Sequence, residues 1–596
     1  MASVASAGVK APKGFGGGRY GNLKSYIAPS LLSSIEQNPM QTFDVIVQGD
    51  PKTKAANFFQ KIMQNRSGSF TGASNGYVQS TNLRRTFQAI DGGEMSLTGW
   101  QILTIAKLGL AQSIVANEPV QSTGTISSLT SLLPMSNTQL WPWAVGAPVD
   151  WLNGTPNAPT IAVVDSGVQS RADFGSRLLG QINILPVSST NSAGDGYGHG
   201  TFVSSIAAGS APGYAGVAPK ANLLSLDVMN DQGEATVSDV IKAADWILAN
   251  KNTYNIKVAN FSLHAANPAS ILFDPLDQAV EDLWVNGITV VAAAGNYRTG
   301  NGPSGVDFAP GNDPFVITVG ATDIGSSLGV GDDSVAPFSA YGYTPDGFMK
   351  PDLGAPGRYM VGAVPVGSAL TKEKPANVTD ASKGYMMLSG TSFSAPIVSA
   401  AAAMLLAQHP SWTPDQVKGA LMATATPEPK VAQGALGVGE VNVVAARMFT
   451  SRYNPPNPNA GLDKYVVSAG DGTKAFNAAA WQSAAIANVA WDDVAWDDAA
   501  WSDAAWSTVA WDDVAWSDVA WASVAYGTVA WDDAAWSDAA WSDAAWADNA
   551  QGDDDTSDIT AASTDTEASD LASLGITDPN CDPTVGSCST TSGLLP

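Results

Sequence analysis

TIAVVD, residues 160–165, is apolar between its first and last residues and ends on an aspartate. A run that is apolar on both faces is typical of a parallel strand covered on both sides, because a strand with one wet face alternates polar and apolar residues. Four later runs have the same character: NLLSLDV (222–228), VANFSL (258–263), ITVVAAAGN (288–296) and FVITVGA (315–321). Together they predict one parallel sheet.

Helical patterns separate these runs, for example VSDVIKAADWILANK (237–251) and PLDQAVEDLWVNG (275–287), where Gly287 is placed to end its helix. Alternating strands and helices predict an α/β fold, an open parallel sheet sandwiched by helices. Ligands of such sheets bind beyond the carboxyl ends of the strands. Polar residues at those ends are therefore candidates for a site.

Four polar residues occupy such positions. Asp165 ends the first strand and Asn296 ends the run AAAGN. Ser392 lies in SGTSFSAP (389–396), just before the apolar helix expected at 395–409, and His199, one of only three histidines, lies in DGYGHGT (195–201) and opens another expected helix. We therefore expect Asp165, His199, Asn296 and Ser392 to meet along one edge of the sheet.

The segments VVDSG, GHGT, AAAGN and GTSFSAP follow one another in the order Asp, His, Asn, Ser, which resembles the subtilisin-like serine proteases, the subtilase family. KPDLGAPG (350–357) and HPSWTPDQVKGALMATAT (409–426) extend the resemblance. It implies a serine endopeptidase with Ser392 as nucleophile, His199 as base and Asp165 orienting the imidazole. Asn296 and the backbone N–H of Ser392 would stabilise the oxyanion. Proteins or peptides would be its substrates.

The same resemblance assigns the substrate-binding residues Ser262, Leu263, His264 and Phe308. Ser262 and Leu263 match the strand that pairs with the substrate backbone. His264 stands where relatives usually have glycine, and Phe308 stands where small residues usually line the pocket for the side chain before the scissile bond. We therefore expect a restricted, uncharged pocket.

Catalysis by such a triad needs no cofactor, and structural calcium is the one ion that the sequence leaves room for. The short loop SAPGYAGV (210–217) lacks the insertion that forms a tight calcium site in some relatives. Asp231, Asp332 and Asp333 lie in expected loops, where acidic residues are usually just solvated. The sequence therefore identifies no metal ligands.

The chain before the catalytic segment resembles an inhibitory propeptide in pattern and position, with an unrelated small domain as the alternative. It would act as an intramolecular inhibitor, removed by self-cleavage of the zymogen. Its expected elements are a strand at 43–48, helices at 55–65 and 95–108, and a strand at 115–120. The domain boundaries that we predict are a flexible lead at 1–40, a small α+β propeptide at 41–120, a processing linker at 121–140, the catalytic domain at 141–450 and a linker at 451–480.

The remaining chain is strongly acidic and repetitive. From Trp481 onward there are 22 Asp or Glu and no Lys or Arg, so this segment carries −22 of the formal charge of −26. Twelve of the fourteen positions spaced five residues apart between 481 and 546 are tryptophan, the others being Ile486 and Tyr526. Residues 481–550 are either a solenoid whose stacked tryptophans bind sugar rings or cell-wall polymer, or a disordered acidic spacer.

Residues 551–596 are acidic, rich in Ser and Thr, and expected to be disordered. Cys581 and Cys588 either close a small disulfide loop there or remain free thiols.

Composition and resemblance leave two functional hypotheses. The body lacks a basic surface for nucleic acid, no apolar run is long enough to cross a bilayer, and no signal peptide is visible at the start. By resemblance we expect an extracellular, secreted protease that processes itself. The alternative is a surface-binding or polysaccharide-binding protein whose Trp repeats carry the function and whose protease body cuts only itself.

Overall fold

The computed structural model describes most of residues 23–481. The residues left out within that span are 50–58, 60–61, 63–77, 79, 123–138, 149–150, 152–157, 189, 269, 301, 326–327, 429, 433, 450–454 and 469–472. The expected helix at 55–65, most of the linker at 121–140, the Trp repeats after Trp481, the tail at 551–596 and both cysteines thus fall wholly or largely outside the described residues.

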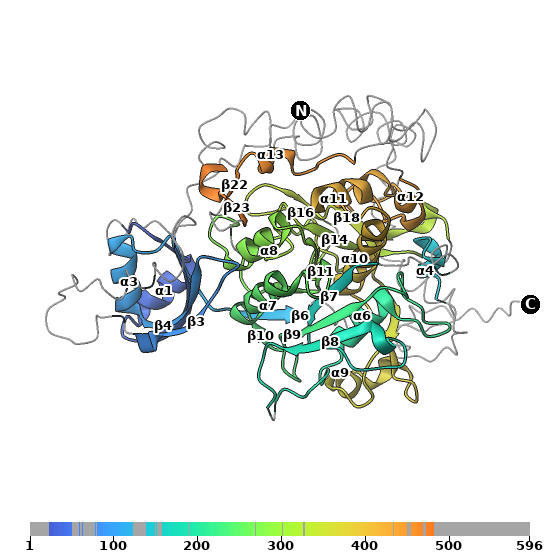
Figure 1. Ribbon diagram of the computed structural model, residues 1–596, viewed down its shortest axis with the longest axis horizontal. Coiled ribbons are helices and arrows are strands. Elements are labelled where there is room, and N and C mark those ends of the chain that lie inside the picture. The colour runs from blue at the N-terminus through green and yellow to red at the C-terminus, as the bar shows by residue number, and fades with distance from the viewer. Residues whose placement is uncertain are drawn as a thin grey trace, which may run out of the picture.

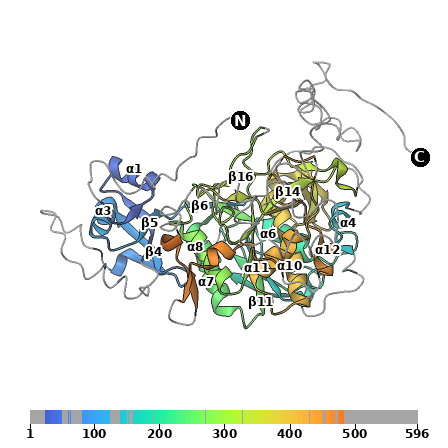
Figure 2. The same ribbon diagram turned by 90° about the horizontal axis from the view of Figure 1, so that it is seen from above.

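A small α+β unit forms the N-terminal part, seen at one end of the molecule in Figures 1 and 2. Its strands run in the order β1 (Tyr26–Ile27), β5 (Ser113–Ala116), β2 (Thr42–Gln48), β4 (Gly92–Thr98) and β3 (Leu83–Thr86). Helices α1 (Pro29–Gln37) and α3 (Gly99–Leu108) complete the unit with a short 3-10 turn, Ser80–Asn82. They share one buried apolar cluster with the sheet.

Three local expectations for this unit are wrong. The single strand expected at 115–120 is two strands, β5 (Ser113–Ala116) in this sheet and β6 (Pro119–Ser122) in a separate one. Residues 26–37 were expected in a flexible lead, yet β1 pairs with β5 and α1 buries Leu31 and Ile35 against the sheet. The helix expected at 95–108 begins only at Gly99, because residues 92–98 form β4, which lies between β2 and β3. Thr98 then caps the helix, accepting from the Gln101 backbone N–H while the Gln101 side chain accepts from the Thr98 N–H.

The body of the protein is built on an eight-stranded sheet. Its strands follow the order β15 (Ser334–Val335), β14 (Ile317–Asp323), β13 (Thr289–Ala293), β11 (Ile256–Phe261), β7 (Thr160–Asp165), β9 (Leu223–Asp227) and β8 (Leu178–Asn183), and β18 (Leu353–Pro356) also pairs with β14. All pairs are parallel except β14 with β15. The predicted open parallel sheet is therefore confirmed.

Helices pack on this sheet in two groups (Figure 1). In the first group, α6 (His199–Ala208) packs against the long helix α10 (Thr391–Gln408), and α10 contacts the strands from β7 to β18. The second joins α7 (Val237–Asn250) to α8 (Pro275–Val285), next to β7 and β13. α10 is long and apolar enough to cross a membrane, but 89% of its apolar window is buried inside the protein, as in a core helix.

Shorter elements surround this core. The helices are α4 (Trp141–Ala144), α9 (Ala369–Glu373), α11 (Pro414–Ala423), α12 (Val443–Met448) and α13 (Ala460–Asp463), with 3-10 turns at Gly175–Arg177, Val330–Asp332 and Pro375–Asn377. The strands are β6 (Pro119–Ser122), β10 (Ala235–Thr236), β12 (Leu263–Ala265), β16 (Gly342–Tyr343), β17 (Met349–Lys350), β19 (Met360–Ala363), β20 (Val378–Asp380), β21 (Tyr385–Leu388), β22 (Val466–Ser468) and β23 (Lys474–Phe476).

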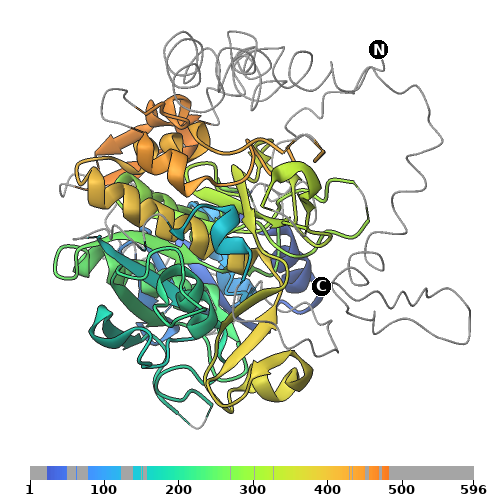
Figure 3. The ribbon, with the colours of Figure 1, turned by 90° about the vertical axis from the view of Figure 1, so that its right-hand side faces the viewer.

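Residues 455–468 and 473–481 lie against the body of the protein, although the sequence predicted a linker at 451–480 (Figure 3, orange). The ring of Phe476 packs edge-on to Phe315 at 4.9 Å, and Trp481, the first tryptophan of the predicted repeats, stacks on Phe348 at 5.5 Å. Trp481 is only 5% exposed. The body of the protein therefore extends to Trp481. The sequence did not predict this, because only a few apolar residues of the segment make the contacts.

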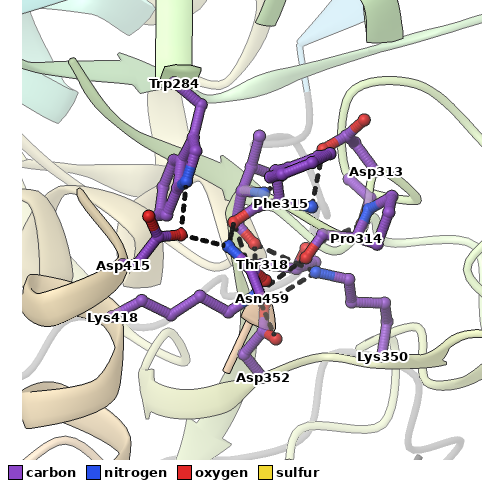
Figure 4. A network of polar contacts seen from close by, with 12 residues as sticks. Trp284, Asp313, Pro314, Phe315, Thr318, Lys350, Asp352, Asp415, Lys418 and Asn459 are labelled. Carbon is purple, nitrogen blue, oxygen red and sulfur yellow. Dashed lines mark hydrogen bonds and ion pairs between the residues drawn. The ribbon is translucent and has the colours of Figure 1, made fainter. Parts of the chain in front are cut away.

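Two buried lysines, Lys350 and Lys418, form a polar network around the residues that lead into β14 (Figure 4). Lys418 Nζ of α11 donates to the carbonyls of Pro314, Phe315 and Val316 at 2.8, 3.3 and 3.1 Å. It also pairs with Asp352 at 2.9 Å, and Asp352 accepts from Lys350 Nζ at 2.8 Å. The Lys418 ammonium thus sits in a cage of carbonyl and carboxylate oxygens. Burial lowers the pKa of Lys350 to about 8.

Candidate active site

Asp165 and His199 form a buried pair at the carboxyl edge of the sheet. Asp165 is the last residue of β7 and His199 the first residue of α6, and neither side chain is exposed. His199 Nδ1 lies 2.7 Å from Asp165 Oδ1. Because a carboxylate can only accept, Nδ1 carries the proton and Nε2 is left as the basic nitrogen.

Asp195 positions the turn that delivers His199. Its carboxylate accepts from the backbone N–H groups of Gly198 and Thr201 at 2.6 and 2.8 Å and from the Ser166 hydroxyl at 2.9 Å. Ser166 Oγ in turn accepts from the Gly200 N–H at 2.9 Å. Burial raises the pKa of Asp195 to about 7.

The surroundings of Gly200 explain why the motif DGYGHGT has a glycine directly after His199. A Cβ at this position would lie 2.1 Å from the Gly167 carbonyl oxygen and 3.1 Å from Asp165 Cβ. Any side chain would therefore push α6 away from β7 and lengthen the Asp165–His199 contact. The glycine serves the approach of helix to strand.

Ser392 lies in the first turn of α10, which starts at Thr391, four residues before the expected helix. Its Oγ donates to the Ser262 carbonyl at 3.0 Å, while Ser262 Oγ donates to the Ser392 carbonyl at 2.8 Å. The adjacent Phe393 ring is 5.6 Å from the His199 ring. The structure thus places the first turn of α10 beside His199, with the Ser392 hydroxyl turned toward Ser262 and His199 Nε2 without a hydrogen-bond partner among the described residues.

Asn296 follows β13 and faces the start of α10. Its Oδ1 accepts from the Thr391 N–H at 2.9 Å and from the Thr391 hydroxyl at 3.0 Å. Thr391 Oγ1 also accepts from the Gly295 N–H at 3.1 Å. Because the amide oxygen is committed to Thr391, donation through Nδ2 is the remaining role of this side chain.

The four expected substrate-binding residues also lie around this edge. Leu263, His264 and Ala265 form β12, which pairs antiparallel with β6 of the N-terminal part: Leu263 lies opposite Ser122 and His264 opposite Gln121. β6 also pairs with β10. A segment that precedes the catalytic body is thus held between two short strands, directly beyond Ser262.

His264 and Phe308 belong to an aromatic cluster with Tyr297, which the sequence did not single out. The His264 ring is 5.1 Å from Phe308 and 5.9 Å from Tyr297, and Tyr297 meets Phe308 edge-on at 4.8 Å. The His264 Nδ1–H donates to the Ala265 carbonyl at 2.7 Å, and burial lowers the pKa of His264. The only sequence signal for Tyr297 was its position directly after Asn296.

Asp195, Ser166 and Thr391 are the supporting residues that sequence reasoning missed. Asp195 stood in the quoted motif, four residues before a helix start, where a carboxylate can accept from the first N–H groups of a helix. Ser166 directly follows Asp165, and Thr391 directly precedes Ser392. Such positions alone give too little specificity to assign a role.

Comparison with known proteins places this arrangement in a family. The model of the subtilase family matches residues 157–447. The serine protease AprX of Bacillus subtilis is 36% identical over 275 residues, which cover 44% of this chain and 60% of AprX. A subtilisin of Bacillus pumilus is 32% identical over 269 residues, covering 45% of this chain and 83% of that protein.

The fold has a solved counterpart. The crystal structure of fervidolysin from Fervidobacterium pennivorans, a keratinolytic enzyme related to subtilisin, superimposes with a TM-score of 0.52 at 20% identity and covers 69% of this chain and 62% of its own. This chain spans about 60% of the length of several of the curated relatives that it matches. With the edge geometry of Asp165, His199, Asn296 and Ser392, these similarities show that the chain belongs to the subtilase family.

Proposed function

We propose that this chain is a serine endopeptidase that hydrolyses peptide bonds in proteins through an acyl-enzyme on Ser392. The observation that carries the proposal is the buried 2.7 Å contact between Asp165 and His199 beside the first turn of α10. Pairing of Nδ1 with an aspartate fixes the tautomer in which His199 Nε2 can act as a base. The family relationship supports the same role.

The proposed reaction begins with rotation of the Ser392 hydroxyl from Ser262 toward His199. Nε2 takes the Oγ proton as Oγ attacks the substrate carbonyl carbon, and the carbonyl electron pair becomes the oxyanion. The Asn296 amide and the Ser392 backbone N–H would donate to that oxyanion. When the C–N bond breaks, the imidazolium returns its proton to the departing amine, and water later repeats the cycle on the ester.

We also propose that the N-terminal unit inhibits the enzyme until it is cut. The support is the position of β6, which fills the space between β10 and β12 that an extended substrate would use. The unit is fastened to the body by Arg85, which pairs with Asp239 at 2.6 Å, and by Tyr26, which stacks on Phe273 at 4.0 Å. Self-cleavage within residues 121–140 would release it, and an extracellular location is proposed on the family relationship.

Digestion of casein by the purified full chain tests the function. We expect casein to be cut, and the chain to lose an N-terminal fragment ending within residues 121–140, both visible by mass spectrometry. A chain that cuts itself but leaves casein intact would contradict the endopeptidase proposal and favour the alternative in which the repeats bind a surface. The Trp repeats after Trp481 lie outside the described residues, so a sugar or cell-wall ligand remains a prediction from sequence.

Replacing Asn296 with alanine is expected to lower kcat by about 10²- to 10³-fold with little change in KM, because the lost donor acts only on the oxyanion. Steady-state hydrolysis of a peptide substrate measures both constants. Asn250→Ala is the matched control, since that amide bonds the Trp246 carbonyl at the far end of α7. An unchanged kcat in Asn296→Ala would exclude an oxyanion role.

A further inference from the structure

Three carboxyl groups meet in a buried place outside the active site. Asp333 precedes β15, Glu428 follows α11, and Glu440 precedes α12, so three separate segments contribute them. One carboxylate oxygen of each lies within 4.8 Å of the others. Such convergence of like charges needs a physical reason.

Each of these groups is almost fully buried and has at least one carboxylate oxygen without a hydrogen-bond partner. Asp333, Glu428 and Glu440 are 6%, 3% and 4% exposed. Asp333 Oδ1, both Glu428 oxygens and Glu440 Oε2 have no hydrogen-bond partner, and no ion pair among the described residues includes any of the three. A buried carboxylate without a partner is strongly unfavourable, so the cluster must gain either protons or a cation.

The electrostatics of the cluster agree with this need. Burial, followed by repulsion from Glu440 and Asp333, raises the pKa of Glu428 to about 10. Burial and the charge of Asp333 raise the pKa of Glu440 to about 8. A bound cation would offset both effects, because it supplies the missing opposite charge to the buried carboxylates.

We propose that Asp333, Glu428 and Glu440 bind a Ca²⁺ ion. The donor set is oxygen only, which suits a hard cation and not zinc or copper. Calcium binds oxygen at about 2.3 to 2.6 Å, so two of its ligands lie up to about 5 Å apart, as these three oxygens do. Magnesium holds several waters in a strict octahedron and suits a dry three-carboxylate cage less well.

This ion would fasten the edge of the sheet to the C-terminal segment. Asp333 belongs to the loop that returns from β14 to β15, where Thr322 lies opposite Val335. Glu440 and Thr426 exchange backbone hydrogen bonds of 2.7 and 2.8 Å, which place Glu428 beside them. The site therefore acts on stability, and its test is independent of whether Ser392 performs catalysis.

Thermal unfolding of the full chain, carrying Ser392→Ala to prevent self-digestion, tests the site. We expect Ca²⁺ at about 100-fold above its Kd to raise Tm by about 5 °C relative to EDTA. Glu440→Gln and Glu428→Gln should lose most of that rise. In EDTA they should unfold at or above the parent's temperature, because each removes one of three repelling acids.

Glu373→Gln is the matched control, because it makes the same chemical change on an exposed residue of α9. It should keep the full Ca²⁺ response. All these variants share the acidic tail, so Ca²⁺ attracted there cancels in the comparison. An equal Tm in Ca²⁺ and EDTA for the parent would overturn the proposal, as would a full Ca²⁺ response in both glutamine variants. If those variants fail to fold, Asp333→Asn takes their place in the same comparison.

Discussion

Ser392→Ala is expected to lower kcat for protein hydrolysis by about 10⁶-fold, the size that removal of the triad serine has in subtilisin. The Ser392 hydroxyl is the group proposed to form the acyl-enzyme, and the alanine variant keeps the hydrogen bond from Ser262 Oγ to the carbonyl of residue 392. The measurement is casein hydrolysis together with labelling by a fluorophosphonate, which reacts with activated serines. The unmodified chain should take up the label on Ser392 and the variant should take up none.

Ser394→Ala is the control for this change. Ser394 lies two residues further along α10, where its hydroxyl donates to the Pro356 carbonyl, so labelling at Ser392 should persist. A trace of unmodified enzyme should trim the Ser392→Ala chain within residues 121–140, which shows that the variant is folded and still cleavable. Self-trimming by Ser392→Ala alone would contradict the proposed nucleophile.

Asp165→Asn is expected to lower kcat by about 10⁴-fold near neutral pH. Asparagine fits the same space, but its amide can present N–H groups to His199 Nδ1, which favours the tautomer whose Nε2 carries a proton and cannot act as a base. Because Asp165 Oδ1 also accepts from the Ser166 N–H at 2.8 Å, the fold around β7 should persist. Fluorophosphonate labelling should slow in parallel with kcat.

Asp380→Asn provides the control, because it makes the same substitution at the last residue of β20, whose carboxylate accepts from Ser382 and Lys383. Both variants should give the circular dichroism spectrum of the parent. An Asp165→Asn enzyme with activity within about tenfold of the parent would mean that Asp165 does not orient His199.

The sheet and the edge residues were predictable because their signals are local and repeated. Runs that are apolar on both faces required a sheet covered on both sides, and polar residues at the ends of such runs required a common edge. The same reasoning placed Asp165, His199, Asn296 and Ser392 together, and their order in the chain added the family resemblance.

Other features depended on contacts that no local pattern carries. β4 continues into the start of a predicted helix because it pairs along its whole length with β2, and Thr98 sets the boundary. Phe476 and Trp481 join the core through aromatic contacts with Phe315 and Phe348, which lie far away in the sequence. The convergence of Asp333, Glu428 and Glu440 joins segments about a hundred residues apart, which spacing in one sequence does not reveal.

Lys418 and the proposed calcium site differ in how they hold positive charge. The Lys418 ammonium occupies a cage of three carbonyls and the Asp352 carboxylate, yet it is tethered to α11 by its own covalent chain. A tethered cation has a fixed effective concentration beside its ligands and cannot be diluted or chelated away. The turn at Pro314–Val316 therefore keeps its cation whatever ions the medium contains, whereas the loop at Asp333 would depend on the calcium that its surroundings supply.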